Sequence, residues 1–122
     1  MSNWSEKQVQ QVWEKGKTVP NNDKDKFRKD FADAWIKRDE HGNQDSIYGW
    51  QIDHQLPVDK KGCDSICNLQ PLQWNNNQTK GNDFPGFKTS VTSKDNTNIE
   101  KTQSWKYNQQ QVNDLKSCCD LK

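Results

Sequence analysis

Apolar residues near the N-terminus recur at helical spacing. Val9, Val12 and Trp13 would lie on one face of a helix, with polar residues on the other faces. Ser5 and Gln8 have the spacing of a capping box, in which each side chain bonds the backbone of the other residue. The pattern predicts an amphipathic helix of about three turns that starts directly after Ser5.

The next apolar residues also recur at helical spacing, and they predict a second helix opened by Asp23 or Asp25. Its apolar face would consist of Phe27, Phe31, Ala34 and Trp35. A second interpretation makes the end of this segment a strand, because residues 35–37 and 47–52 form two extended runs around the turn-rich residues 41–43. This interpretation predicts a hairpin between the two runs.

The middle of the chain predicts the order strand, loop, strand, helix. Residues 52–58 form a short apolar run, residues 59–67 a polar loop, and residues 69–72 a second short run. Residues 74–82 are polar and predict a helix that Gly81 closes. We therefore expect two short strands with a helix directly after the second.

The C-terminal part of the chain predicts one further element. Beyond residue 86, a polar stretch to about residue 104 shows no clear periodicity and is left unassigned. Asn108 and Gln111 then repeat the capping-box spacing, ahead of Leu115. They predict a last helix that starts at Asn108.

The length and the charge of the chain narrow the class of protein. A chain of 122 residues suffices for one domain and not for two cores of ordinary size. Leu, Ile, Val and Phe occupy only 20 positions, but the six Trp residues add large apolar area to the core. Lys and Arg number 18 against 17 Asp and Glu, which leaves a net charge of +1. Without a basic stripe, the charge pattern argues against tight sequence-independent binding of nucleic acid through charge alone.

The cellular location and the cysteine chemistry follow from the same composition. No stretch approaches the roughly 20 apolar residues of a membrane span, and residues 1–6 lack the pattern of a signal peptide. We therefore expect an intracellular, cytoplasmic protein with no membrane partner. The four cysteines are Cys63, Cys67, Cys118 and Cys119. Their spacing is not that of a disulfide framework, so we expect free thiols, with a structural Zn²⁺ site as the less favoured alternative.

A longer pattern runs through the predicted strand, loop, strand and helix. It consists of a strand with Asp-His, a loop that leads to Asn-Leu, and a helix with Asn and Lys three residues apart. Its residues in this chain are Asp53, His54, Asn68, Asn77 and Lys80. In order and spacing, the chain resembles the HNH endonuclease family over about residues 49–85.

The resemblance implies an α+β fold with a ββα-metal (HNH) core and additional N- and C-terminal helices. Residues 1–122 would form a single HNH nuclease domain. Its motif core spans about residues 49–85, between a helical N-terminal extension of residues 1–35 and a C-terminal extension of residues 86–122.

The predicted activity is hydrolysis of phosphodiester bonds in DNA, with RNA left open as a substrate. His54 is the candidate general base, because imidazole is the side chain that exchanges protons most readily near neutral pH. Asp53 and Asn77 are the candidate metal ligands. Their oxygen atoms favour Mg²⁺ or Mn²⁺ over Zn²⁺.

Two further residues have expected roles beside the base and the metal. Asn77 and Lys80 would share one helix face, so Lys80 is expected to orient the phosphate at the cation. The resemblance gives Asn68 a supporting role, as a brace of the loop beside the base. Because adjacent strand residues point to opposite faces, Asp53 and His54 can share a site only at a strand end or a distortion.

The chain also departs from the family pattern. Many members have a zinc-binding Cys-x-x-Cys pair where this chain has Gln73 and Asn76, so we expect Trp74 and neighbouring aromatics to replace that zinc site as core. Asp59 and Asp64 are expected to shape the loop without a catalytic role. Two alternatives stay open: a catalytically weak or inactive nucleic-acid-binding module of the HNH fold, and a structural zinc protein built on the four cysteines. The oligomeric state is not predicted.

Overall fold

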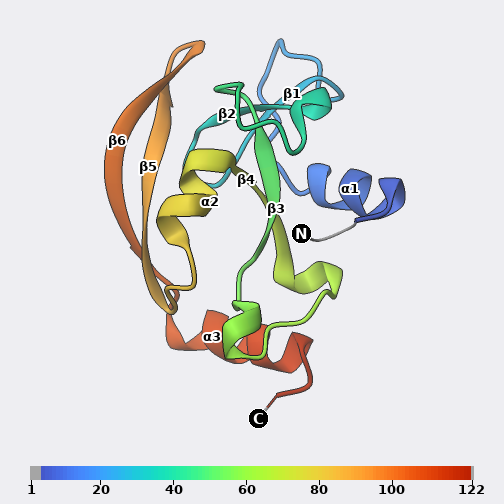
Figure 1. Ribbon diagram of the computed structural model, residues 1–122, viewed down its shortest axis with the longest axis vertical. Helices are drawn as coiled ribbons and strands as arrows, with labels where there is room; N and C mark the ends of the chain where they lie inside the picture. The colour runs from blue at the N-terminus through green and yellow to red at the C-terminus, as the bar shows by residue number, and fades with distance from the viewer. Residues whose placement is uncertain (1–3, 122) are drawn as a thin grey trace.

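Three two-stranded antiparallel sheets and three α-helices form the described part of the chain, residues 4–121, in the computed structural model (Figure 1). The helices and strands are α1 (Glu6–Trp13), β1 (Phe27–Lys29), β2 (Trp35–Lys37), β3 (Trp50–His54), β4 (Leu69–Gln73), α2 (Trp74–Lys80), β5 (Gly86–Lys94), β6 (Thr97–Lys106) and α3 (Gln109–Cys118). One-turn 3₁₀ helices lie at Arg38–Glu40, Val58–Lys60 and Ile66–Asn68. The sequence correctly predicts a mixture of α-helices and β-strands. No helix among residues 4–121 is long and apolar enough to cross a bilayer.

The first and last helices begin at the predicted capping boxes. At α1, Ser5 Oγ accepts a hydrogen bond from the Gln8 backbone (3.1 Å), and Gln8 Oε1 accepts one from the Ser5 backbone (2.9 Å). At α3, Asn108 and Gln111 make the same reciprocal pair, both at 2.8 Å. These boxes satisfy backbone donors that a helix start leaves open, so the two predictions are confirmed.

Residues 27–37 form a β-hairpin, so the predicted second helix is wrong. β1 pairs antiparallel with β2, with Lys29 opposite Trp35. Asp30 closes the turn, because its Oδ1 accepts hydrogen bonds from the N–H groups of Ala32 (3.0 Å) and Ala34 (2.9 Å). The carboxylate thus satisfies locally the donors that a helix would bond along its axis. In the described part of the predicted helical extension, the only α-helix is α1.

The predicted hairpin between residues 35–37 and 47–52 is also wrong. β2 pairs with β1, and β3 pairs with β4. A single backbone bond from Lys37 N to Tyr48 O (3.0 Å) joins the two runs. The extended run of residues 35–37 correctly predicts a strand, but it carries no information about which strand is its partner.

The predicted order strand, loop, strand, helix is confirmed. β3 and β4 pair antiparallel, with His54 opposite Leu69. β3 ends at His54, earlier than predicted, because the backbone beyond it bonds the Asn68 side chain instead of a strand. α2 follows β4 directly, and Gln73 Oε1 caps it by accepting from the N–H groups of Asn75 (2.8 Å) and Asn76 (3.1 Å).

A long hairpin of β5 and β6 occupies the stretch that the sequence leaves unassigned. β5 packs on α2 and buries Phe87, Thr89 and Val91. β6 lies on the side of β5 away from α2 (Figure 1), and most of its residues are exposed. Because β6 has no continuous buried face, its sequence lacks the alternation that predicts a strand.

An apolar cluster joins α1 to the sheet of β3 and β4. Its buried members are Val9, Val12, Trp13, Ile36, Trp50, Ile52 and Leu69. The rings of Trp13 and Trp50 pack at a tilt, with centroids 5.4 Å apart, and both side chains are fully buried. The aromatic core expected from the Trp content therefore packs between α1 and β3.

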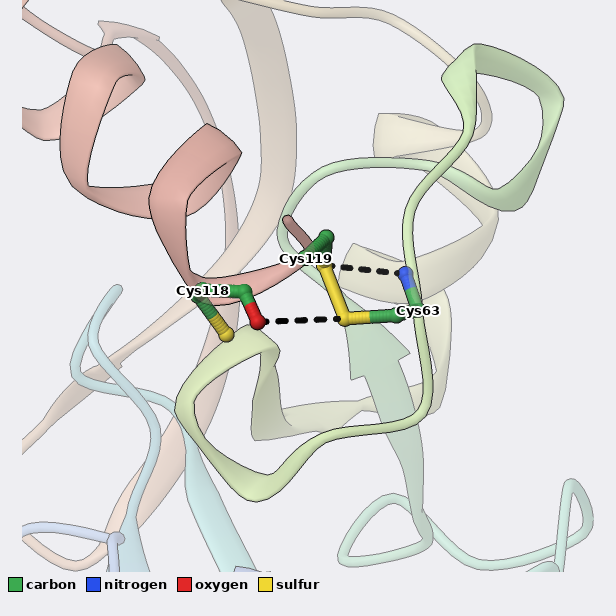
Figure 2. A group of neighbouring side chains, drawn as sticks. All are labelled: Cys63, Cys118 and Cys119. Atoms are coloured by element: carbon green, nitrogen blue, oxygen red, sulfur yellow. Dashed lines mark hydrogen bonds between the residues drawn. A yellow bond between two sulfur atoms is a disulfide. The ribbon is translucent and has the colours of Figure 1, made fainter. Parts of the chain in front are cut away.

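Two disulfides tie the end of α3 to the loop between β3 and β4, so the expectation of free thiols is wrong. Cys63 pairs with Cys119, and Cys67 pairs with Cys118. Figure 2 shows the first bond crossing from the loop to the end of the helix. The partners are 56 and 51 residues apart, which is why sequence spacing gives no sign of them. Structural disulfides are typical of oxidising compartments, so this pairing does not support the expected cytoplasmic location.

Candidate active site

A pocket of about 240 Å³ opens between β3 and the C-terminal end of α2. Its lining includes Asp53, His54 and Asn77, the three residues that the sequence assigns to the metal and the base. Two of them come from the end of β3 and one from α2, which packs against β3. The fold therefore brings together side chains that are more than twenty residues apart in the chain.

Asp53 and His54 both line the pocket at the end of β3. His54 is the last residue of the strand and is still paired with Leu69, so the pocket includes two adjacent strand residues whose side chains have different partners. Asp53 is buried, and the His54 side chain is partly exposed. Of the two possibilities, a strand end and a distortion, the structure has the strand end.

The Asp53 carboxylate is held by two donors at the bottom of the pocket. Its Oδ2 accepts from Gln70 Nε2 (2.9 Å), and its Oδ1 accepts from Lys80 Nζ (3.3 Å). Burial raises the pKa of the Asp53 carboxyl above its ordinary value, while the Lys80 ammonium acts in the opposite direction. Gln70 is the cross-strand partner of Asp53 and is absent from the sequence-based site. Only the strand register could have identified it.

Lys80 lies beneath the pocket and not on its surface. Its side chain is fully buried, and Nζ donates to Asp53 Oδ1 and to the backbone oxygen of His54 (3.1 Å). The ammonium also lies 5.4 Å from the centre of the Phe87 ring. In this arrangement Lys80 supports both residues at the end of β3 and makes no contact with the pocket opening. The predicted phosphate contact is not formed by this conformation.

The nitrogen and the oxygen of the Asn77 side-chain amide have different roles. Its Nδ2 donates to Gln51 Oε1 (2.6 Å), a side chain of β3. This bond orients the amide, because only the amide nitrogen can donate a hydrogen bond to Gln51 Oε1. The remaining amide oxygen is the atom that a hard cation prefers.

His54 has a carboxylate partner that the sequence assigns to another role. Its Nε2 lies 2.7 Å from Oδ1 of Asp64, in the loop between β3 and β4. The His54 ring also packs at a tilt against Trp4, with ring centroids 5.6 Å apart. Asp64 therefore belongs to the site, and it was missed because a loop residue ten positions away has no periodic relation to the strand.

Asn68 joins the two ends of the loop that follows His54. Its Oδ1 accepts from Leu56 N (2.8 Å), and its Nδ2 donates to Leu56 O (3.1 Å) and Cys63 O (2.9 Å). The side chain is fully buried, so these bonds are shielded from water. This is the bracing geometry that the resemblance implies for Asn68.

The positions where many HNH proteins have zinc-binding cysteines hold a polar network instead. Asp30 Oδ2 accepts from the Gln73 backbone and from Asn76 Nδ2, both at 3.0 Å. Asn76 Oδ1 also accepts from the N–H of Val91 (2.7 Å), so the network reaches β5. Burial raises the pKa of Asp30 to about 6. The expectation that aromatic residues replace the zinc site is therefore wrong. Hydrogen bonds of Asp30 and Asn76 connect the β1–β2 turn, α2 and β5, and Trp74 is only partly buried.

The residues that line the pocket suit a hard cation. The Asp53 carboxylate has four lone-pair positions and uses two of them on Gln70 and Lys80, so its oxygens retain acceptor capacity. With the amide oxygen of Asn77, this gives two oxygen ligands of the kind that Mg²⁺ and Mn²⁺ use alongside water.

The comparisons with known proteins add no relative to this description. No protein-family model matches the chain, and no curated protein or solved structure is significantly similar to it. A function for this chain is therefore argued from the site and its geometry.

Proposed function

We propose that the chain is a metal-dependent endonuclease of the HNH type that hydrolyses phosphodiester bonds in DNA. The observation that carries the proposal is the convergence of Asp53, His54 and Asn77 on one pocket. In the proposal, β3, β4 and α2 form the ββα-metal core, and the other elements support it.

Each residue has one chemical task in this proposal. Asp53 and Asn77 hold a divalent cation, Mg²⁺ or Mn²⁺, which would stabilise negative charge on the phosphate and the leaving oxygen. His54 takes the proton from the attacking water. Lys80 positions Asp53 and the backbone of His54, and Asn68 braces the loop that follows.

DNA is the proposed substrate because the pocket is open, polar and on the surface, where a backbone phosphate can enter it. The net charge of +1 provides no large basic field, so the affinity for DNA should be modest and sensitive to salt. Cleavage of RNA in place of DNA would revise the substrate and leave the chemistry intact.

A plasmid-nicking assay tests the proposal. The parent should convert supercoiled plasmid to nicked plasmid with Mg²⁺ or Mn²⁺, and EDTA should stop the reaction. His54→Ala should lower the rate by about 10²- to 10⁴-fold, the usual contribution of a general base. His41→Gln is the matched control, since it changes the other histidine of the chain, which lies outside the pocket lining.

Two results would contradict the nuclease. Equal rates for His54→Ala and the parent would remove His54 as the base. Binding of DNA without cleavage under any divalent ion would favour the inactive nucleic-acid-binding module of the same fold.

A specific observation supports a second candidate, the cysteine-based structural zinc protein. The sulfur atoms of Cys63, Cys118 and Cys119 lie within 4.8 Å of one another, so reduction of the disulfides would leave at least three thiols close together. Cys67 is bonded to Cys118 and would be the fourth ligand. Disulfide sulfur does not bind zinc as a thiolate does, so this candidate requires all four cysteines in the reduced state. One zinc ion per chain and four reactive thiols after zinc removal would establish it.

A further inference from the structure

The Asp64 carboxylate contacts the candidate base His54, and Asp64 lies between the two loop cysteines that form disulfides. We propose that Asp64 is a positioning residue that fixes the orientation and the tautomer of the His54 ring, and that the two disulfides hold Asp64 in place. The proposal rests on the proposed nuclease function, in which His54 takes a proton from water. It adds to that function a reason for the C-terminal helix and for the four cysteines.

The contact between Asp64 and His54 selects one tautomer. An ionised carboxylate only accepts hydrogen bonds, so the Nε2 atom at 2.7 Å must carry the proton of the ring. Nδ1 of a neutral His54 is then the nitrogen with a free lone pair. The base would therefore act through Nδ1, and Asp64 would keep the ring in that form.

The backbone of His54 is already fixed from two sides. Lys80 Nζ donates to the His54 carbonyl oxygen (3.1 Å), and the next N–H, of Gln55, donates to the backbone oxygen of Asn68 (2.8 Å). These bonds fix the backbone and not the ring, which packs against Trp4 on one side. The Asp64 carboxylate provides the bond that fixes the rotation of the ring.

Asp64 must itself be held in place if it is to fix the orientation of the His54 ring. Its side chain is 70 % exposed, against 16 % for His54. An exposed ion pair contributes only about 0–1 kcal/mol, because water and salt compete with it and two side chains lose freedom. A mobile loop would therefore leave His54 without a stable partner.

The disulfides provide that restraint on both sides of Asp64. Cys63, the residue before it, is bonded to Cys119, and Cys67, three residues after it, is bonded to Cys118. Figure 2 shows one further contact that holds Cys63: its N–H donates to Cys119 Sγ (3.1 Å). The loop segment that carries Asp64 thus has its ends attached to adjacent residues of one helix end.

α3 is itself anchored, so it can serve as the fixed side of this attachment. Leu115 is buried, and the Tyr107 ring just ahead of α3 packs against Phe87 of β5, with ring centroids 5.4 Å apart. Just before α3, the Tyr107 hydroxyl donates to Gln55 Oε1 (3.3 Å), next to His54. The C-terminal extension therefore contacts the surroundings of the base at two separate points.

Reduction of the disulfides should release the loop. Each disulfide takes up two electrons and two protons from a dithiol reductant, which becomes a cyclic disulfide, so two disulfides yield four thiols. The proposal then predicts a less ordered Asp64 and a ring of His54 that samples both tautomers.

Nitrogen-15 NMR of the imidazole ring provides the test that does not depend on activity. In a His41→Gln background the chain has a single histidine, whose ring shifts report which nitrogen carries the proton. We expect Nε2–H in the parent and a mixture of tautomers in Asp64→Asn, since an amide can donate or accept. Asp59→Asn removes the same charge from an exposed position of the same loop and should leave the ring unchanged.

Steady-state nicking tests the functional part. Asp64→Asn should lower kcat by about tenfold or more with little change in KM, which is the scale of outer partners of a catalytic or metal-bound histidine. Asp59→Asn should match the parent. The double variant Cys63→Ser/Cys119→Ser should resemble Asp64→Asn in both kcat and ring shifts, and adding Asp64→Asn to it should cost little more. Cys67→Ser/Cys118→Ser keeps the crosslink next to Asp64 and should have the smaller effect.

The possible outcomes distinguish a failure of the positioning role from a failure of the proposed nuclease function. Failure of the parent to nick any plasmid would overturn the proposed function, while the ring shifts would still test the hold of Asp64 on His54. An active parent with unchanged kcat and ring shifts in Asp64→Asn would overturn the positioning role. Full activity and an ordered ring in Cys63→Ser/Cys119→Ser, folded by circular dichroism, would overturn the role of the disulfides.

Discussion

The Lys80 ammonium lies 3.3 Å from Oδ1 of Asp53, and both side chains are buried beneath the pocket. Two opposite charges in such a place depend on each other, because removal of one leaves the other without compensation in a medium that solvates it poorly. This pair links the stability of the fold to the residue that is proposed to hold the cation.

Lys80→Met should destabilise the protein strongly. The variant keeps the length and the apolar stem of the side chain but leaves the buried Asp53 charge unpaired, which typically costs about 3–5 kcal/mol. Urea unfolding followed by tryptophan fluorescence measures the free energy of unfolding. Lys101→Met, on the exposed strand β6, removes the same charge and should change this free energy by less than about 0.5 kcal/mol. Similar losses for the two variants would show that the ion pair with Asp53 has no special weight.

Asn68→Ala should loosen the loop between β3 and β4. The substitution removes three hydrogen bonds and leaves the backbone groups of Leu56 without their partner. We expect a loss of about 3 kcal/mol in the free energy of unfolding and faster amide exchange at Leu56. Asn113→Ala, at an exposed position of α3, is the matched control. Amide exchange at Leu56 as slow as in the parent would contradict the bracing role.

Asp30 should make stability depend on pH in the acidic range. Burial raises its pKa to about 6 from the ordinary value of 3.8, so between these values the native state keeps a proton that the unfolded chain has lost. The native state therefore binds more protons in this window, and the contribution of Asp30 to stability is present below pH 3.8 and lost as the pH rises toward 6. Carbon-13 NMR of the Asp30 carboxyl measures the titration directly. A midpoint at or below the ordinary value would contradict this effect of burial.

The disulfides should be intact in the isolated protein and should stabilise it. Thiol titration under denaturing conditions should find no free thiol before reduction and four after it. From the chain-entropy model, closure of a loop of 56 or 51 residues is worth roughly 4 kcal/mol for the first bond and less for the second, because the two loops overlap. Reduction with a dithiol should lower the urea midpoint accordingly. Four free thiols with bound zinc would contradict the disulfides and favour the zinc candidate.

Local signals in the sequence predicted the parts of the fold that depend on neighbours in the chain. The capping boxes at Ser5 and Asn108 place α1 and α3, and the run around Asp53 and Asn77 places β3, β4 and α2. Each of these signals lies within one helix, one strand or the residues that flank it, so local spacing identifies each element.

The features that the sequence did not predict depend on contacts between distant segments. The spacing of Phe27 and Phe31 fits a helix, but the side chain of Asp30 turns the backbone and a strand forms instead. Asp64 and Gln70 enter the site only through the loop fold and the strand register. The cysteine pairs likewise form only after α3 meets the loop. None of these contacts has a periodic trace in the chain.

The most direct test of the central claim is a crystal structure of the parent grown with Mn²⁺, with anomalous diffraction to locate the metal. We expect a single strong peak in the pocket, within ligand distance of a carboxylate oxygen of Asp53 and the amide oxygen of Asn77, with His54 on the side open to solvent. A pocket without a peak at saturating Mn²⁺, or a peak bound only by other residues, would contradict it.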